Sequence, residues 1–179
     1  MTQKNYDLRK LINISIFSVL GFLIMFFTEI SVFPAAFFLK YDCSEITSLL
    51  IAFKYGPQAG ILTVIIRNML FFMMKEGGGL AGIIASTFSS VLFVLIASLY
   101  YSKRKNMNTV YLSLFFAIII NAAAMVPINY SLITYIYKIP VDMGSTIIYG
   151  VIPFNIFKGI LNSVILLFVY KKIWRFLEK

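Results

Sequence analysis

The chain has 179 residues, of which 60% are hydrophobic and 13% charged, and its formal net charge is +9. Soluble domains contain about 45–50% apolar and about 25% charged residues. The apolar excess therefore excludes an ordinary cytosolic enzyme, a disordered tail and a nucleic-acid-binding domain. A single cysteine and the absence of histidine exclude an internal disulfide and a Cys/His metal site. We interpret the chain as an integral membrane protein without chemistry of its own.

Six stretches are predicted to form one all-α bundle of transmembrane helices. A bilayer core about 30 Å thick needs roughly 20 apolar residues per helix. Five stretches are long enough, and they are Leu11–Phe27, Pro57–Met74, Leu80–Tyr101, Thr109–Tyr137 and Ser145–Tyr170. The sixth, Cys43–Phe53, is short, but Asp42 and Glu45 look like a helix cap with its reciprocal acid, and Gly56 followed by Pro57 looks like a stop. We expect residues 1–179 to form a single six-helix transmembrane domain.

The basic residues are distributed unequally between the two predicted sides of the membrane. Six spans place both termini on one side, together with Lys4, Arg9, Lys10, Lys54, Lys103, Arg104, Lys105, Lys171, Lys172, Arg175 and Lys179. The other side holds only Lys40, Lys75 and Lys138. Because cytoplasmic loops are enriched in Lys and Arg, both termini should be cytoplasmic. The positive charge then reflects membrane topology, and it requires no nucleic-acid partner.

The last span carries a polar stripe in its middle. Asn155, Lys158 and Asn162 are spaced at i, i+3 and i+7, so they share one helical face. A charged side chain within a membrane costs at least about 2.5–3.5 kcal/mol. The stripe either joins helices by hydrogen bonds or meets a polar ligand. The ammonium group of Lys158 favours a ligand with carbonyl oxygens.

Two asparagines flank Pro127 in the fifth span. Carboxamides offer donors and an acceptor that complement the imide edge of a heterocycle. For Asn121, hydrogen bonding between helices is an equal alternative. Asn129 lies nearer the outer end of the span, which favours a role in ligand binding.

Two other features lie on the predicted outer side. The connection Thr28–Asp42 contains three phenylalanines, a tyrosine and Pro34, and it is predicted either to cover a flat aromatic ligand or to rest on lipid. Arg67 lies in the outer half of the third span, where we expect it to pair with an acid on the outer side, such as Glu29, or to extend its side chain towards that side.

The sequence also resembles a known family. The resemblance rests on Phe38-Leu39-Lys40-Tyr41-Asp42, Ser44, Glu45, Tyr55-Gly56-Pro57 and Gly60, followed in the last span by Pro153, Asn155, Lys158 and Gly159. It is to the substrate-binding S-component of energy-coupling-factor (ECF) vitamin transporters, and it fits the riboflavin-specific branch best. Nearly the whole chain is covered.

The resemblance implies a bacterial plasma-membrane protein that binds riboflavin, with flavin mononucleotide as an alternative ligand. The vitamin would be transported cargo, with no cofactor. Transport would require a transmembrane coupling T-component and two ATP-binding subunits, because this chain has no ATP-binding motif.

The resemblance also implies roles for individual residues. The ring edge of the vitamin would meet Asn155 and Lys158, with Asn129 contributing from the fifth span. The segment holding Leu39, Lys40 and Asp42 would close over the ligand. The family's small-xxx-small docking motif on the first helix matches Ser15 and Val19, of which Val19 departs from the pattern.

Three other functions remain as alternatives. In the first, the same fold binds another vitamin or heterocycle. A structural membrane subunit would use the polar stripe only to hold its helices together. A membrane enzyme is disfavoured because the sequence shows no histidine, no intramembrane acid pair and no nucleophile beside a base.

Overall fold

The computed structural model describes residues 3–33, 38–75, 80–137 and 142–178. Its helices are α1 (Gln3–Thr28), α2 (Glu45–Tyr55), α3 (Pro57–Met74), α4 (Leu80–Lys103), α5 (Met107–Leu132), α6 (Met143–Thr146) and α7 (Ile152–Glu178). Two π-helical segments, η2 (Ile133–Tyr137) and η3 (Ile147–Val151), extend α5 and join α6 to α7. The short strands β1 (Ile30–Ser31) and β2 (Lys40–Tyr41) pair antiparallel between α1 and α2.

Five helical stretches of the described chain are long and apolar enough to cross a membrane. They are Asn5–Thr28, Pro57–Met74, Leu80–Lys103, Met107–Ile136 and Met143–Lys172. Each contains or closely overlaps a predicted span, because lipid requires apolar helices that satisfy their own backbone hydrogen bonds. The sixth predicted span corresponds to α2, which has 11 residues and is not among the five.

The boundaries of α2 follow from its flanking residues, although the expected capping pair is wrong. Ser44 occupies the N-cap position, and no side-chain hydrogen bond caps the helix. Asp42 instead accepts hydrogen bonds from Ser44. At the other end, Gly56 has φ 93° and its N–H donates to the carbonyl of Ala52. Glycine tolerates this left-handed conformation, and Pro57 then begins α3.

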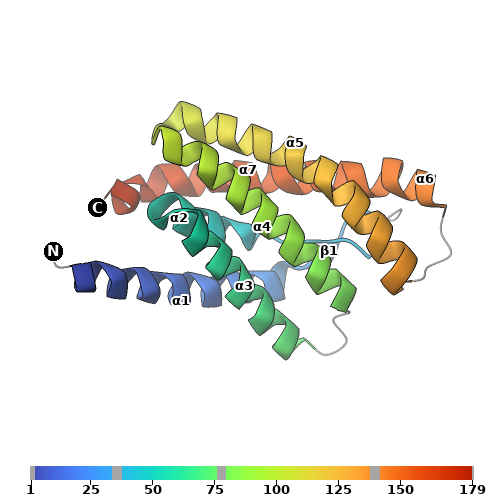
Figure 1. Cartoon of the computed structure of the whole chain (residues 1–179), viewed down its shortest axis with the longest axis horizontal. Helices are drawn as coiled ribbons and strands as arrows, with labels where there is room; N and C mark the ends of the chain where they lie inside the picture. Colours follow the sequence, from blue (N-terminus) through green and yellow to red (C-terminus); the bar gives the residue numbers. More distant parts are fainter. Residues whose placement is uncertain (1–2, 34–37, 76–79, 138–141, 179) are drawn as a thin grey trace.

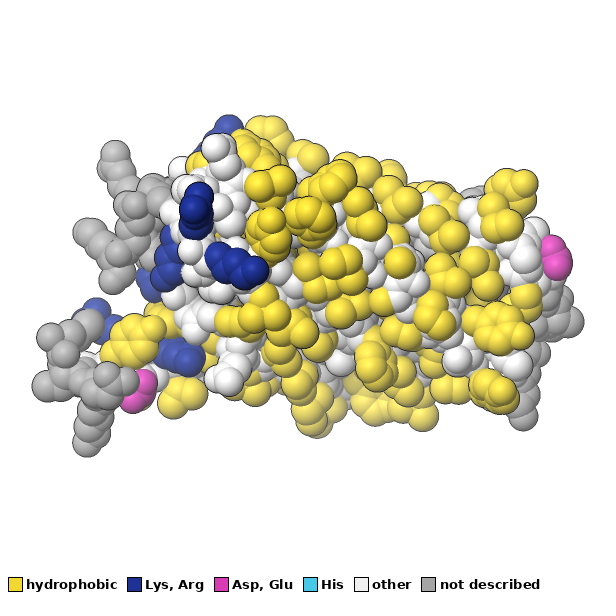
Figure 2. Space-filling model, turned by 45° about the horizontal axis from the view of Figure 1, so that its top comes forward, with side chains coloured by type: hydrophobic (Ala, Val, Ile, Leu, Met, Phe, Trp, Pro, Cys, Tyr) yellow, Lys and Arg dark blue, Asp and Glu magenta, His cyan; other side chains and the backbone are white. Residues whose placement is uncertain are grey.

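The helices surround α2, which lies in the middle of the bundle. It packs against α1, α3, α4 and α7, and the long helices also pack in the pairs α1–α3, α3–α4, α4–α5 and α5–α7 (Figure 1). Both chain ends lie at the same end of the bundle (Figure 1). Lys and Arg side chains gather at this terminal end, while hydrophobic side chains cover the middle of the visible face (Figure 2).

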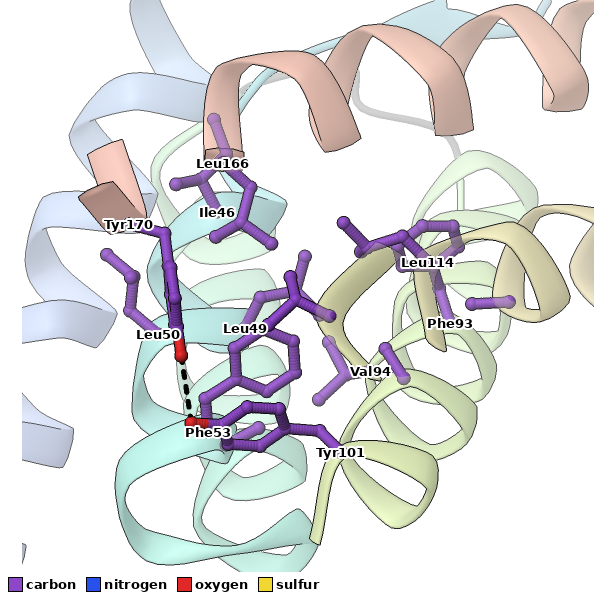
Figure 3. Close-up of a cluster of buried hydrophobic side chains, with 14 of the residues drawn as sticks. Ile46, Leu49, Leu50, Phe53, Phe93, Val94, Tyr101, Leu114, Leu166 and Tyr170 are labelled. Atoms are coloured by element: carbon purple, nitrogen blue, oxygen red, sulfur yellow. Dashed lines mark hydrogen bonds between the residues drawn. The ribbon is translucent and has the colours of Figure 1, made fainter. Parts of the chain in front are cut away.

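The largest buried cluster lies in the terminal half of the bundle (Figure 3). It joins α2 to the C-terminal half of α4, the N-terminal half of α5 and the C-terminal half of α7. The ring of Phe53 stacks on Tyr101 at a centroid distance of 4.4 Å, and the hydroxyls of Tyr101 and Tyr170 lie 2.9 Å apart. Gly60 permits close packing of α3, since a Cβ there would lie 2.7 Å from Val94 Cγ1.

Candidate ligand-binding site

A cavity of about 280 Å³ lies in the half of the bundle away from the termini. Its walls come from the C-terminal ends of α1 and α3, from the β2 region, from the N-terminal halves of α4 and α7, and from Met125 of α5. The short length of α2 explains this space: 11 residues of helix extend about 16 Å, roughly half of a bilayer core. The β1–β2 hairpin enters the other half of the bundle and leaves the cavity beside it.

The structure brings five of the seven predicted ligand-site residues to this cavity. Leu39, Lys40 and Asp42 reach it from the β2 region, and Asn155 and Lys158 reach it from one face of α7. The remaining wall is mainly apolar and includes Met25, Phe38, Phe71, Met125 and Phe154. A few polar groups set in an apolar wall are typical of sites for small organic ligands.

A buried ion pair lies at the cavity wall. Lys158 Nζ is 3.6 Å from Asp42 Oδ2, and both side chains are almost fully buried. The other carboxylate oxygen accepts hydrogen bonds from the backbone N–H of Ser44 at 3.0 Å and from its hydroxyl. Both oxygens of the Asp42 carboxylate therefore have partners, with Lys158 on one side and Ser44 on the other.

The polar stripe of α7 divides into two parts. Asn155 donates to the carbonyl of Val151 at 2.8 Å, which orients its amide at the cavity wall. Asn162, two turns beyond, donates to Glu45 Oε2 at 2.9 Å and accepts from the hydroxyl of Tyr41 at 3.2 Å. Asn162 thus joins α7 to α2 and β2, as in the helix-joining alternative. Asn155 and Lys158 occupy the part that faces the cavity.

The expected pairing of Arg67 with Glu29 is wrong. The Glu29 carboxylate contacts Lys75 and lies 3.5 Å from Lys40 Nζ, at the end of α1. Arg67 is instead buried in the bundle, where it donates to Asn68 and to Ser90 on α4. The sequence could not predict this arrangement, because Lys40 pairs with Glu29 only when the β1–β2 pairing brings Lys40 to the end of α1.

Asn121 and Asn129 are buried but do not line the cavity. Asn121 donates to Ser89, a cavity residue on α4, at 3.0 Å. Asn129 donates to the carbonyl of Met125 one turn earlier at 2.8 Å. Among the described residues, neither amide oxygen has a hydrogen-bond partner. Both therefore keep an unused acceptor near the site.

Comparison with known proteins identifies the family. The family model described as "ECF transporter, substrate-specific component" matches residues 9–170. The chain belongs to this family. Its members are components of transporters, not enzymes. The chain is a multi-pass bacterial membrane protein.

Relatives with solved structures or curated functions are similar over almost their whole length. The riboflavin transporter RibU of Staphylococcus aureus is 28% identical, covering 96% of this chain and 93% of the relative. The riboflavin transporter FmnP of Bacillus subtilis is also 28% identical, covering 93% of each. A solved structure of the S component of a bacterial ECF transporter superposes with a TM-score of 0.85 at 29% identity, covering 99% of this chain and 100% of that one.

The predicted docking residues lie on the outer face of α1. Ser15 is exposed and its hydroxyl donates to the carbonyl of Leu11 at 3.0 Å, and Val19 is 47% exposed. The neighbouring face of α1 is buried against the bundle through Ile14 and Ser18. Within this S-component the two residues therefore face outward and do not take part in internal packing.

Sequence reasoning missed one wall of the cavity. Gly82, Ala85, Ser86 and Ser89 of α4 line it, at the spacing i, i+3, i+4 and i+7 of one helical face. This stripe of small and hydroxyl-bearing residues was visible in the sequence. Lys75 and Glu29 also line the cavity, at helix ends where charged residues usually indicate only the membrane boundary.

Proposed function

We propose that this chain is the riboflavin-binding S-component of an ECF transporter. It takes up the vitamin together with a transmembrane coupling T-component and two ATP-binding subunits that hydrolyse ATP. The family assignment and the similarity to two riboflavin transporters support this proposal. The observation that carries it is the cavity, whose mainly apolar wall includes Lys158 and Asn155 one turn apart on α7.

The chemistry of riboflavin fits this cavity. The ring has two carbonyl oxygens and an imide N–H along one edge, and Lys158 and Asn155 supply the donors and the acceptor that this edge needs. The flat aromatic faces pack against Phe38, Phe154 and Met125. Lys158 then shares its protons between Asp42 and the ligand, and so avoids being an unpaired charge in a membrane.

The hairpin and α5 would complete the site when the ligand binds. The segment holding Leu39, Lys40 and Asp42 lies directly on the cavity, and we assign it to closure over the ring. Asn129 and Asn121 each retain an amide oxygen without a partner in the described structure. A small shift of α5 towards the bound vitamin would let these oxygens accept hydrogen bonds from the ligand or from the cavity wall.

The membrane arrangement that we propose has six spans, with residues 1–179 acting as one unit and both termini in the cytoplasm. Two features support it. Both termini lie at the same end of the bundle (Figure 1), and basic side chains gather there (Figure 2), as expected for a cytoplasmic face. In this arrangement α2 and the hairpin that precedes it cross the membrane together.

The outward face of α1 is our proposed docking face for the coupling subunit. Ser15 is small and exposed, so a partner helix can approach closely there. Val19 adds bulk one turn further on, which limits how closely the same helix can pack.

Mass spectrometry of the small molecule that copurifies with the full chain tests the ligand assignment. Riboflavin, and a yellow preparation, are expected. A different vitamin would keep the family and overturn the ligand. The absence of any bound or titratable small molecule would favour a structural membrane subunit.

Membrane vesicles containing the chain alone and the chain with its partner subunits test the transport assignment. Riboflavin binding is expected in both, but ATP-dependent accumulation only with the partners. Accumulation by the chain alone would contradict the division of labour proposed here.

A further inference from the structure

The cavity has a second polar wall, on α4, to which the proposed function gives no role. Gly82, Ala85, Ser86 and Ser89 line the cavity from one face of this helix. The α7 wall offers an ammonium and an amide, whereas the α4 wall offers two neutral hydroxyls. The two walls therefore suit different chemical groups of a ligand.

The hydroxyls of the α4 wall are not used by their own helix. A serine in a membrane helix commonly donates to the carbonyl one turn earlier, as Ser98 and Ser163 do in this chain. Ser86 Oγ is buried and has no hydrogen-bond partner among the described residues. Ser89 Oγ accepts a hydrogen bond from Asn121 Nδ2 at 3.0 Å. Within the described structure, both O–H groups are therefore available to a ligand.

Asn121 of α5 determines how Ser89 can meet a ligand. Its side chain is buried and does not line the cavity, so its contact with the cavity wall is through Ser89. A hydroxyl has one O–H and two lone pairs on its oxygen. Because Asn121 donates to one lone pair, Ser89 keeps its O–H and its second lone pair for a group in the cavity.

The charged groups of the cavity wall are engaged with one another. Lys40 and Lys75 both contact Glu29, and Lys158 pairs with Asp42. Such groups suit the anionic or carbonyl-bearing parts of a ligand. The α4 hydroxyls instead suit an alcohol, because an alcohol also donates and accepts at one oxygen without carrying a charge.

We propose that the α4 wall is the subsite for the hydroxyl-bearing side chain of the ligand. Ser86 and Ser89 bind this chain, and Asn121 is the positioning residue for Ser89. The inference rests on the proposed function, which places the ring edge of riboflavin at Lys158 and Asn155 and leaves its sugar-alcohol chain unassigned. The α7 wall then binds the ring and the α4 wall binds the chain.

Titrations of the purified full-length protein with riboflavin and with lumiflavin separate the two walls, because lumiflavin carries a methyl group in place of the sugar-alcohol chain. The wild type should bind riboflavin at least about tenfold more tightly than lumiflavin. Ser86→Ala and Ser89→Ala should each weaken riboflavin binding about three- to tenfold, the effect of one lost hydrogen bond. Lumiflavin binding should change less than about twofold.

The matched control is Ser98→Ala. This buried serine also lies on α4, but its hydroxyl donates to the carbonyl of Val94 and it does not line the cavity. Both affinities should keep their wild-type values in this variant.

A double-mutant cycle tests the positioning role of Asn121. The readout is the ratio of the lumiflavin and riboflavin dissociation constants, which a general loss of stability would not change. Asn121→Ala should lower this ratio about threefold in the wild-type background and leave it almost unchanged in the Ser89→Ala background. Equal lowering in both backgrounds, or no change in either, would overturn the positioning role.

The same titrations can overturn the subsite. Unchanged riboflavin affinity in the double variant Ser86→Ala/Ser89→Ala would do so, as would equal losses for the two flavins, because the serines would then not bind the chain. If the double variant does not accumulate in the membrane, the single variants decide in the same way. Equal wild-type affinity for both flavins would overturn the subsite and leave the proposed function intact. If the wild type binds neither flavin, the proposed function fails and the subsite fails with it.

Discussion

The two halves of the bundle differ in how they fill the space between the long helices. In the terminal half, α2 occupies the centre and packs Leu49 and Phe53 into an apolar cluster (Figure 3). In the other half the centre holds the β1–β2 hairpin, a charged cluster and a cavity of about 280 Å³. The same long helices line both halves. One short helix thus separates a stabilising core from a binding site.

Polar groups of α7 are tolerated in both halves of this membrane protein, for different reasons. Asn155 and Lys158 lie where α2 is absent, and they line the cavity. Asn162 lies level with the first residue of α2, Glu45, and donates a hydrogen bond to its carboxylate. The position of a polar α7 residue relative to the N-terminal end of α2 therefore decides whether it joins helices or faces the cavity.

The largest effect on stability is expected in the terminal half. Phe53→Ala removes a ring that stacks on Tyr101 and contacts Tyr170, and it should lower the free energy of unfolding by about 3–5 kcal/mol. Chemical denaturation in detergent measures this change. Riboflavin affinity of the folded fraction should stay at the wild-type value, and a marked loss would show that the two halves are not separable.

Substitutions in the cavity half should affect binding first. Asn155→Ala and Lys158→Ala should each weaken riboflavin binding by about 1–3 kcal/mol, because each leaves a ligand group without its buried partner. Calorimetric titration measures the loss, with the exposed residue Asn108 changed to alanine as a matched control. Unchanged affinity in both variants would remove these side chains from the site.

A smaller effect on stability is expected from one hydroxyl in the terminal half. Tyr170→Phe deletes the hydrogen bond to Tyr101 while keeping the ring, and it should cost about 0.5–1.5 kcal/mol of unfolding free energy. Tyr111→Phe, on the exposed face of α5, is the control and should cost less. A change in riboflavin affinity for Tyr170→Phe would contradict the separation of the two halves.

A substitution on the outer face of α1 should change neither the stability of the terminal half nor ligand binding in the other half. Ser15→Trp places a large side chain on an exposed position, so folding and riboflavin binding should be unchanged, while ATP-dependent uptake should be lost because a partner helix can no longer approach. Uptake assays in vesicles containing the complete transporter measure this. Normal uptake would exclude this face from docking, and Leu112→Trp on the exposed side of α5 provides the control.

The long helices of the fold were predictable from the sequence, and the pairings inside it were only partly so. Runs of apolar residues indicated five spans because a membrane requires them, and Gly56-Pro57 indicated the boundary between α2 and α3. The periodicity of α7 placed Asn155, Lys158 and Asn162 on one face. It could not show that, of these three residues, Asn162 is the one that hydrogen-bonds to Glu45. That pairing depends on how deep in the bundle α2 starts.

The electrostatic partners depended on the hairpin, whose path is not encoded in any local pattern. Its return brings Lys40 to Glu29 and Asp42 to Lys158. Arg67 therefore does not pair with Glu29, as the sequence had suggested, and instead donates hydrogen bonds to Asn68 and Ser90 in the bundle interior. The α4 wall with Ser86 and Ser89 had a readable helical spacing, but small residues in a membrane helix also serve packing, and only the cavity distinguishes the two uses.

A structure of the full chain with riboflavin bound tests the central claim most directly. The ring should lie in the cavity between α4 and α7, with its carbonyl-bearing edge within hydrogen-bond distance of Lys158 Nζ and the Asn155 amide. A ring bound elsewhere in the bundle, with Lys158 still contacting Asp42 alone, would contradict it.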